Sequence, residues 1–208
     1  MPSDAATPSS QTTTIESSRV SDSASWIDLS RFRNDEFSRG RGRGVVTLWY
    51  FCSILFFEGG WFPFSSLKTG LLRALGATIG RNVVIKPNVR IKFPWRLRVG
   101  NHSWIGQNVW IDNLAQVDVG NNVCISQSSY LCTGSHDHRR LGFDLITKPI
   151  NIEDGAWVGA RSTIFQGVVV GANSLIAGGS VVVKNVGPME VVAGNPAVRI
   201  AYREAPRL

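Results

Sequence analysis

Between Ile79 and Val182 an aliphatic residue recurs at a spacing of six positions, interrupted by two steps of eight (Ile91 to Val99 and Ile111 to Val119) and by one longer gap after Leu131, and this spacing dominates the hydrophobic pattern of the chain. A period of six fits neither the 3.6-residue period of a helix nor the alternation of a long strand. It is typical of a hexapeptide repeat, in which each unit forms one short strand and one corner. The positions fall into five groups of three: Ile79, Ile85, Ile91; Val99, Ile105, Ile111; Val119, Ile125, Leu131; Ile152, Val158, Ile164; and Val170, Ile176, Val182.

The positions between the aliphatic residues are also constrained. Turn-forming pairs such as Asn121-Asn122 and Gly178-Gly179 stand two and three residues after the aliphatic one, where a corner would place its positive-φ backbone. The sequence therefore predicts an all-β parallel β-helix of about five coils, whose aliphatic side chains stack along one axis. The first position after the aliphatic residue is often small (Gly80, Gly100, Gly106, Gly120, Gly159, Gly171, Ala177), and the fourth is Ser, Ala or Val (Ser103, Val109, Val123, Ser129, Ala156, Ser162, Val168, Ser174, Ser180).

Four regions are expected along the chain. Residues 1–25 are rich in Ser, Thr, Ala and Asp, which predicts a disordered tail, and they lack the charged start and apolar core of a signal peptide. Residues 26–78 form an aromatic and helical N-terminal segment. Coils are expected over 79–186, and 187–208 form a C-terminal tail. The leucines of 67–76 lie at helical spacing and predict a short helix that caps the column.

The N-terminal segment contains a basic run followed by an apolar stretch. Arg39, Arg41 and Arg43 precede the apolar residues 45–57, which are too few to cross a bilayer because a spanning helix needs about 20 residues. Two compatible interpretations of 39–64 remain open. The stretch packs on the end of the prism or on a neighbouring subunit, or it is a basic and aromatic surface in peripheral contact with a membrane.

Composition narrows the choice of partners and compartment. The net charge of +7 and the pI near 9.8 suggest an anionic ligand or surface, but the basic residues are scattered and no nucleic-acid-binding motif occurs, so we expect no nucleic acid partner. Three widely spaced cysteines give neither a disulfide framework nor a cysteine-type zinc site. These features favour a cytoplasmic protein, with peripheral contact at the inner face of the membrane as an additional alternative.

The largest interruption of the repeat, residues 132–151, is predicted to be a loop that protrudes between the third and fourth coils. Long loops on a rigid scaffold often carry function. This one contains His136 and His138, two of the three histidines of the chain, and an imidazole is the usual general base near neutral pH.

The hexapeptide coils, the loop sequence Thr133 to His138 and the ending Ala193 to Ala197 resemble those of hexapeptide-repeat acetyltransferases. From Trp26 onward the chain is similar to the colanic-acid or exopolysaccharide O-acetyltransferases of that superfamily. The resemblance implies a left-handed β-helix, a homotrimer with active sites between neighbouring prisms, and acetyl-CoA as co-substrate. It also implies direct transfer of the acetyl group, in a ternary complex, to a hydroxyl of a sugar in surface polysaccharide biosynthesis.

The resemblance also suggests roles for individual residues. In galactoside-type relatives the catalytic histidine directly follows a Thr-Gly pair, whereas here Ser135 intervenes. His136 is therefore the first choice for the general base, and His138 is the alternative. By the same resemblance the pantetheine arm of the cofactor contacts the backbone near Ala160 and Gly178, and Lys184 and Arg199 are cofactor-binding cations.

Three further polar residues are candidates for the acceptor side of the site. Asp137 stands between the two histidines and could orient one imidazole. Asp112 and Asn113 occupy a corner one coil below the loop. They are predicted to bind acceptor hydroxyls, or else they are simple turn residues.

Three rival functions are weighed against this interpretation. The first is a zinc-dependent carbonic anhydrase of the same fold, but that enzyme needs a local histidine pair about five residues apart, and His136 and His138 are two apart. No metal is therefore expected. The second keeps acetyl-CoA but uses an amine, serine or antibiotic hydroxyl as acceptor, and the third is a non-catalytic scaffold. The histidine loop and the C-terminal tail argue against a scaffold.

Overall fold

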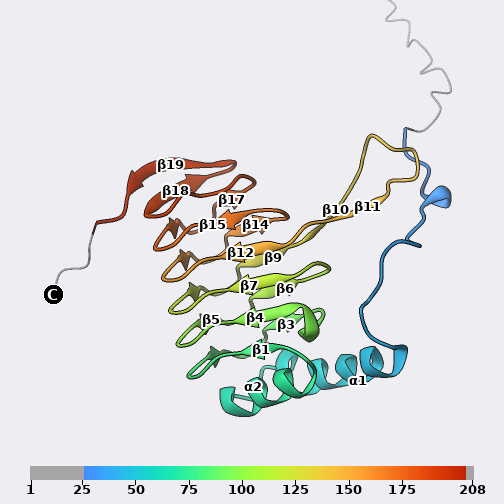
Figure 1. Cartoon of the computed structure of the whole chain (residues 1–208), viewed down its shortest axis with the longest axis horizontal. Helices are drawn as coiled ribbons and strands as arrows, with labels where there is room; N and C mark the ends of the chain where they lie inside the picture. The colour runs from blue at the N-terminus through green and yellow to red at the C-terminus, as the bar shows by residue number, and fades with distance from the viewer. Residues whose placement is uncertain (1–25, 205–208) are drawn as a thin grey trace, which may run out of the picture.

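The computed structural model describes residues 26–204, so the disordered tail predicted for residues 1–25 lies outside the described residues. The chain forms a β-helix whose short strands stack into three parallel sheets, seen as stacked rungs in Figure 1. We call these sheets faces A, B and C, in the order in which the chain first visits them. The solenoid and its helical N-terminal segment confirm the predicted fold class.

The faces are built from strands that recur at equivalent places in successive coils. Face A contains β1 (Thr78–Ile79), β4 (Leu97–Val99), β7 (Val117–Val119), β12 (Ile150–Ile152) and β15 (Val169–Val170). Face B contains β2 (Val84–Ile85), β5 (Trp104–Ile105), β8 (Cys124–Ile125), β13 (Trp157–Val158), β16 (Leu175–Ile176), β18 (Glu190–Gly194) and β19 (Ala197–Tyr202). Face C contains β3 (Arg90–Ile91), β6 (Trp110–Asp112), β9 (Tyr130–Cys132), β14 (Thr163–Phe165) and β17 (Val181–Val182).

The core is the predicted aliphatic column. All fifteen positions of the six-residue series are buried, and the strand register stacks equivalent residues, as for Ile105 on Ile125 and Ile125 on Val158. The small residues of the fourth position are buried too, and several bridge coils. The Ser103 hydroxyl, for example, donates to the Gly120 carbonyl at 2.7 Å. Apolar burial therefore stabilises the column along its whole length.

The corners explain the other constrained positions of the repeat. The third residue after the aliphatic one has positive φ in coil after coil, as at Asn82, His102 and Asn122, a conformation that Asn tolerates well. His102 is therefore an exposed corner residue. The residue directly after the aliphatic one is glycine where coils approach closely, since a Cβ on Gly100 would lie 2.5 Å from the Gly120 carbonyl carbon.

Helices close the base of the prism, as the sequence predicts. Helix α1 (Arg43–Ser53) continues into the π-helical turn η2 (Ile54–Glu58), and α2 (Ser65–Ala74) follows. Figure 1 shows α1 and α2 beneath β1. Trp49 and Phe57 join the core, and the Trp49 indole donates to the Ile91 carbonyl at 2.9 Å. No helix in residues 26–204 is both long and apolar enough to cross a membrane.

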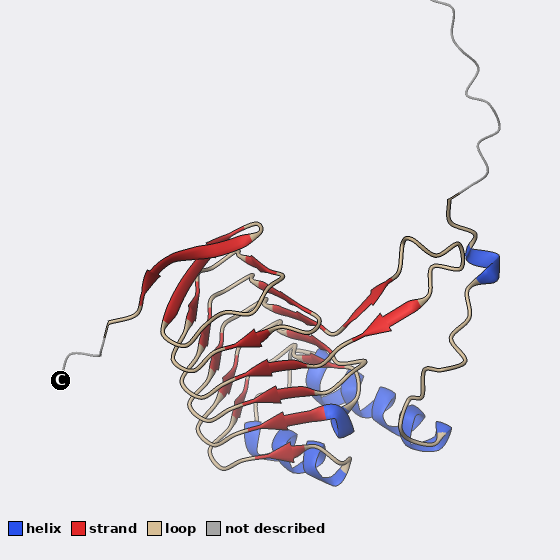
Figure 2. Cartoon of the chain, turned by 45° about the horizontal axis from the view of Figure 1, so that its top comes forward, coloured by secondary structure: helices blue, strands red, loops and turns tan. Residues whose placement is uncertain are grey.

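Two departures from the plain repeat shape the molecule. Between β9 and β12 the chain leaves the prism as an antiparallel hairpin of β10 (Gly134–His136) and β11 (Leu145–Thr147), the protrusion predicted at 132–151 (Figure 2). After the five complete coils a sixth is partly formed, because Val186 bridges Val170 and β18 pairs with β16. Strand β19 then turns back antiparallel on β18, so the region predicted as a tail extends face B.

Candidate active site

His136 lies on β10 of the protruding hairpin, and its imidazole has a fixed orientation. Its Nδ1 is 2.7 Å from the Phe143 carbonyl oxygen, and its ring stacks on the Phe143 ring with centroids 4.4 Å apart and planes 3° apart. The Phe32 ring approaches the imidazole at 5.7 Å. Phe143 has φ of 53°, a strained conformation for a bulky residue, and strain of this kind is common where a side chain must be held in place.

The contact with Phe143 sets the tautomer of the neutral imidazole. A carbonyl oxygen only accepts hydrogen bonds, so Nδ1 must carry the hydrogen, and Nε2 is left with the lone pair. A general base needs such a lone pair directed at its substrate. The hairpin therefore presents an imidazole whose orientation and free Nε2 lone pair are those that a general base needs.

The environments of His138 and Asp137 differ from that of His136. His138 is exposed beyond the end of β10. Asp137 accepts from the Arg139 backbone N–H at 3.0 Å and from its guanidinium at 3.3 Å, and these bonds hold the pKa of the Asp137 carboxyl below its usual range. Asp137 was predicted to orient an imidazole, but in the structure its carboxylate faces Arg139 and Arg140. The Phe143 carbonyl orients His136 instead.

Asp112 ends β6 at the edge of the prism where face C passes to face A, one coil below the hairpin. We call this the C–A edge. The Lys92 ammonium lies 3.0 Å from one carboxylate oxygen, and the Tyr130 hydroxyl donates to the other at 3.2 Å. Burial and the neighbouring Cys132 and Asp112 raise the pKa of Tyr130, so this hydroxyl stays protonated. The contact between Asp112 and an acceptor stays a prediction.

Asn113 does not fit its predicted role. It is fully buried, and its amide oxygen accepts from the Phe93 N–H at 2.9 Å. The amide nitrogen donates to the carbonyls of Phe93 and Arg96 at 2.6 and 3.0 Å, which uses both of its hydrogens. Asn113 therefore ties two coils together, and the structure argues against a contact with acceptor hydroxyls.

The predicted cofactor residues are divided between two edges. Ala160 and Gly178 lie on successive coils at the edge where face B passes to face C, the B–C edge, and the Gly179 N–H donates to the Ala160 carbonyl at 2.8 Å. Lys184 follows β17 on the C–A edge and is exposed. Arg199 lies on β19, where it pairs with Glu190 at 3.2 Å and stacks over the Tyr202 ring. One chain therefore brings Asp112, His136 and Lys184 to one edge but leaves Ala160 and Gly178 on another.

Part of the N-terminal segment lies against the hairpin and forms one side of the candidate site, which the sequence did not predict. Residues 26–42, which we call the strap, run from the hairpin to α1 (Figure 1). The Asp28 N–H donates to the Leu141 carbonyl at 2.8 Å, and Arg96 stacks on Phe37. Large apolar residues in this otherwise polar segment, Phe32 and Phe37 among them, were the sequence signal that could have indicated a packed segment.

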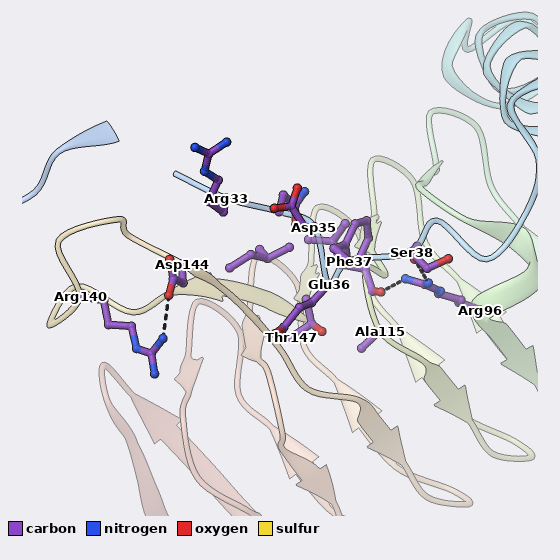
Figure 3. Close-up of a pocket in the computed structure, with 13 residues that line it drawn as sticks. Arg33, Asp35, Glu36, Phe37, Ser38, Arg96, Ala115, Arg140, Asp144 and Thr147 are labelled. Atoms are coloured by element: carbon purple, nitrogen blue, oxygen red, sulfur yellow. Dashed lines mark hydrogen bonds and ion pairs between the residues drawn. The ribbon is translucent and has the colours of Figure 1, made fainter. Parts of the chain in front are cut away.

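A groove of about 680 Å³ lies between the strap and the hairpin (Figure 3). Asp35, Glu36 and Phe37 line it from the strap, and Thr147 and Asp144 line it from the hairpin. Leu145, which pairs with His136 across the hairpin, also lines it. The groove thus adjoins the strand that carries His136.

No group of three His, Cys, Asp or Glu side chains that could hold a metal ion occurs within residues 26–204. His102 lies at a corner, 3.4 Å from the Asn82 amide, while His136 bonds to a carbonyl on the hairpin.

Comparisons with known proteins agree with this fold. Residues 149–184 match the family described as the hexapeptide repeat of succinyl-transferase. The chain is 38% identical over 178 residues to WcaF of Escherichia coli K12, whose name assigns it to colanic acid biosynthesis as an acetyltransferase; the match covers 85% of this chain and 97% of WcaF.

Solved structures show the same relationship. A hexapeptide-repeat acetyltransferase of Vibrio cholerae complexed with acetyl coenzyme A superposes with a TM-score of 0.70 at 30% identity, covering 78% of this chain and 88% of that one. A galactoside acetyltransferase in complex with coenzyme A superposes with a TM-score of 0.66 at 25% identity, covering 78% and 84%. With this agreement of repeat, hairpin and relatives, the chain belongs to the hexapeptide-repeat acetyltransferase family.

Proposed function

We propose that the protein transfers the acetyl group of acetyl-CoA to a hydroxyl of a sugar in surface polysaccharide biosynthesis, with His136 as the general base. The observation that carries the proposal is the bond from His136 Nδ1 to the Phe143 carbonyl, because it leaves Nε2 as the proton acceptor. The relatives named for colanic acid and for galactoside acetylation support a sugar acceptor.

The reaction needs one proton acceptor and no covalent enzyme intermediate. His136 Nε2 takes the hydroxyl proton while the sugar oxygen attacks the thioester carbonyl. The tetrahedral intermediate then expels the coenzyme A sulfur, which receives that proton, so an ester and a free thiol leave the site. We place the acceptor in the groove between strap and hairpin, where Asp35, Glu36 and Thr147 offer hydrogen bonds and Phe37 offers an apolar wall.

The active form is proposed to be a homotrimer, because a single chain does not complete the site. His136 stands at the C–A edge, while Ala160 and Gly178 stand at the B–C edge of the same prism. A neighbouring prism placed beside the hairpin would bring its own B–C edge to the base. Ala160, Gly178, Lys184 and Arg199 would then bind acetyl-CoA across the interface, the cations facing its phosphates.

Activity can be measured as free-thiol release from acetyl-CoA with a panel of sugar, serine and amine acceptors. We expect His136→Ala to lower kcat by about 10²–10⁴-fold and His138→Ala to leave it nearly unchanged, while both variants still bind acetyl-CoA by calorimetry. Full activity in His136→Ala would refute the assignment of the base. A wild-type protein that does not bind acetyl-CoA would refute the transferase.

The shared site is tested by mixing two inactive variants. His136→Ala removes the base, and Gly178→Trp would block the pantetheine path on the exposed B–C edge. Co-assembled trimers contain some interfaces with an intact base from one chain and an intact edge from the next, so part of the activity should return. Absence of recovery in verified mixed trimers would show that each chain forms its own site.

A further inference from the structure

Helix α1 and the turn η2 are apolar on the side opposite the core. Trp49, Ser53 and Phe57 face the prism and are buried, whereas Leu48, Phe51, Ile54 and Leu55 are 45–64% exposed. A helix that is apolar all round is normally covered on both sides. Within residues 26–204 nothing covers this outer side, which faces away from the prism because α1 lies beneath its base (Figure 1).

The apolar surface continues past η2. Trp61, Phe64 and Leu67 are each about 60% exposed, and Phe56, Phe62 and Phe64 form a chain of edge-to-face contacts. Between Arg43 and Ser65 the only charged residue is Glu58, which is engaged by Ser53 and Arg90. We call this outer surface, formed by Leu48, Phe51, Ile54, Leu55, Trp61, Phe64 and Leu67, the basal apolar surface.

Three arginines lie in the chain directly before α1 and at its first residue; the Arg41 guanidinium lies beside Gly76 and Trp95, and the Arg39 carbonyl accepts from the Trp95 indole at 2.7 Å. Arg39, Arg41 and Arg43 are exposed, and none of them forms an ion pair among the described residues. Tyr50 and Trp61 add aromatic rings with a polar atom, the kind of side chain enriched where membranes meet water. Basic, aromatic and aliphatic groups on one exposed, non-spanning segment are the combination that binds at a lipid interface.

From this arrangement we propose that the basal apolar surface docks on an anionic membrane, with Leu48, Phe51 and Leu55 inserted among the acyl chains and the three arginines on the headgroups. A second copy of the chain is a poorer occupant, because two such surfaces in contact would bring like arginine clusters together. The inference does not depend on the chemistry at His136. In a trimer whose prisms stand side by side, three basal apolar surfaces would share one plane and bind with avidity.

The test is sedimentation of the full chain with vesicles of phosphatidylcholine alone or mixed with phosphatidylglycerol. We expect binding to the mixed vesicles that weakens as salt is raised. Replacing Arg39, Arg41 and Arg43 together by Gln should lower the partition coefficient about 100-fold, since each cation near an anionic surface contributes about fivefold. The triple variant Leu48→Ser, Phe51→Ser, Leu55→Ser should lower it by about as much or more, because it removes the inserted groups.

The matched control is Val198→Ser with Ile200→Ser, which changes equally exposed apolar side chains on β19 at the far end of the prism. The control should bind vesicles like the wild type. All variants should keep their melting temperature and their thiol release with a water-soluble acceptor, so a failure here is separable from a failure of the proposed function. Unchanged vesicle binding in the triple serine variant would overturn the proposal. Loss of the oligomer in that variant, measured by native mass spectrometry, would also overturn it and indicate that the surface binds a protein partner.

Discussion

Replacing Asn113 by alanine would distinguish a structural residue from a sugar-binding one. The substitution removes three hydrogen bonds that join the corner of one coil to Phe93 and Arg96 of the coil below. Alanine cannot replace them, and water has no access to the fully buried site. The Phe93 N–H and the Arg96 carbonyl would lose the amide as a partner inside the protein, whereas the Phe93 carbonyl would still accept from the Arg96 N–H at 3.0 Å.

The magnitude follows from those two groups. Each buried polar group that loses its partner costs roughly 1–3 kcal/mol, so the loss at two groups in Asn113→Ala should lower the free energy of unfolding by roughly 2–6 kcal/mol. For a chain of this size that corresponds to a melting temperature about 10 °C lower. Asn185→Ala is the control, because its amide accepts a single exposed bond from the Val169 N–H at 2.9 Å and should cost only about 1 kcal/mol.

The assay is thermal unfolding followed by tryptophan fluorescence, together with KM for the acceptor at a temperature where the variant is folded. We expect a large fall in melting temperature and little change in KM. A variant that melts like the wild type but needs far more acceptor would refute the structural role and restore the sugar contact.

Three further substitutions test the close packing of the coils, the buried charge of Lys68 and the positioning of His136 by Phe143. Gly100→Ala should destabilise the protein by about 1–3 kcal/mol, because the added Cβ would collide with the next coil. Gly70→Ala is the control, because it adds its Cβ in open space on α2 and should stabilise the protein by about 1 kcal/mol. The free energies of unfolding of both variants are measured in urea. Burial lowers the pKa of Lys68, so its charge opposes folding at neutral pH and this penalty shrinks as pH rises through the lowered pKa toward 10.5. Lys68→Met should therefore melt higher at neutral pH, by roughly 1 kcal/mol, with a smaller advantage near pH 10; an advantage that grows with pH would contradict this. Phe143→Gly should relieve the strain of the positive φ and leave the melting temperature equal or higher. It should nevertheless lower kcat about tenfold, because the imidazole of His136 loses its stacking partner. Unchanged kcat would show that the carbonyl alone positions His136.

The repeat could be predicted from sequence because one physical requirement recurs in every unit. An inward aliphatic residue such as Ile125 and a positive-φ corner such as Asn122 appear at fixed spacing, so each coil repeats the same evidence. The hairpin was visible as a gap in that series.

Features that depend on distant contacts were not visible in the sequence. Asp112 and Asn113 look alike in sequence, as adjacent polar residues at a corner, but only Asn113 turns inward, toward a backbone twenty residues earlier. The strap has no periodicity to show that Phe32 and Phe37 lie on the hairpin and on the first coils. Asp137 was likewise only a candidate to orient one imidazole, and the structure places the partner of His136 seven residues away, at the carbonyl of Phe143.

The position of that carbonyl shows how the hairpin orients His136. Phe143 stands just before β11, and His136 ends β10, so the antiparallel register of the two strands brings base and carbonyl together. The Asp137 N–H to Asp144 carbonyl bond, at 2.8 Å, closes the hairpin at the same level. The strap adds Phe32 against the imidazole and ties Asp28 to Leu141. The orientation of the His136 imidazole therefore depends on two segments about a hundred residues apart in sequence. If His136 is the base as proposed, a substitution in the strap, such as Phe32→Ala, should lower kcat more than it lowers the affinity for acetyl-CoA.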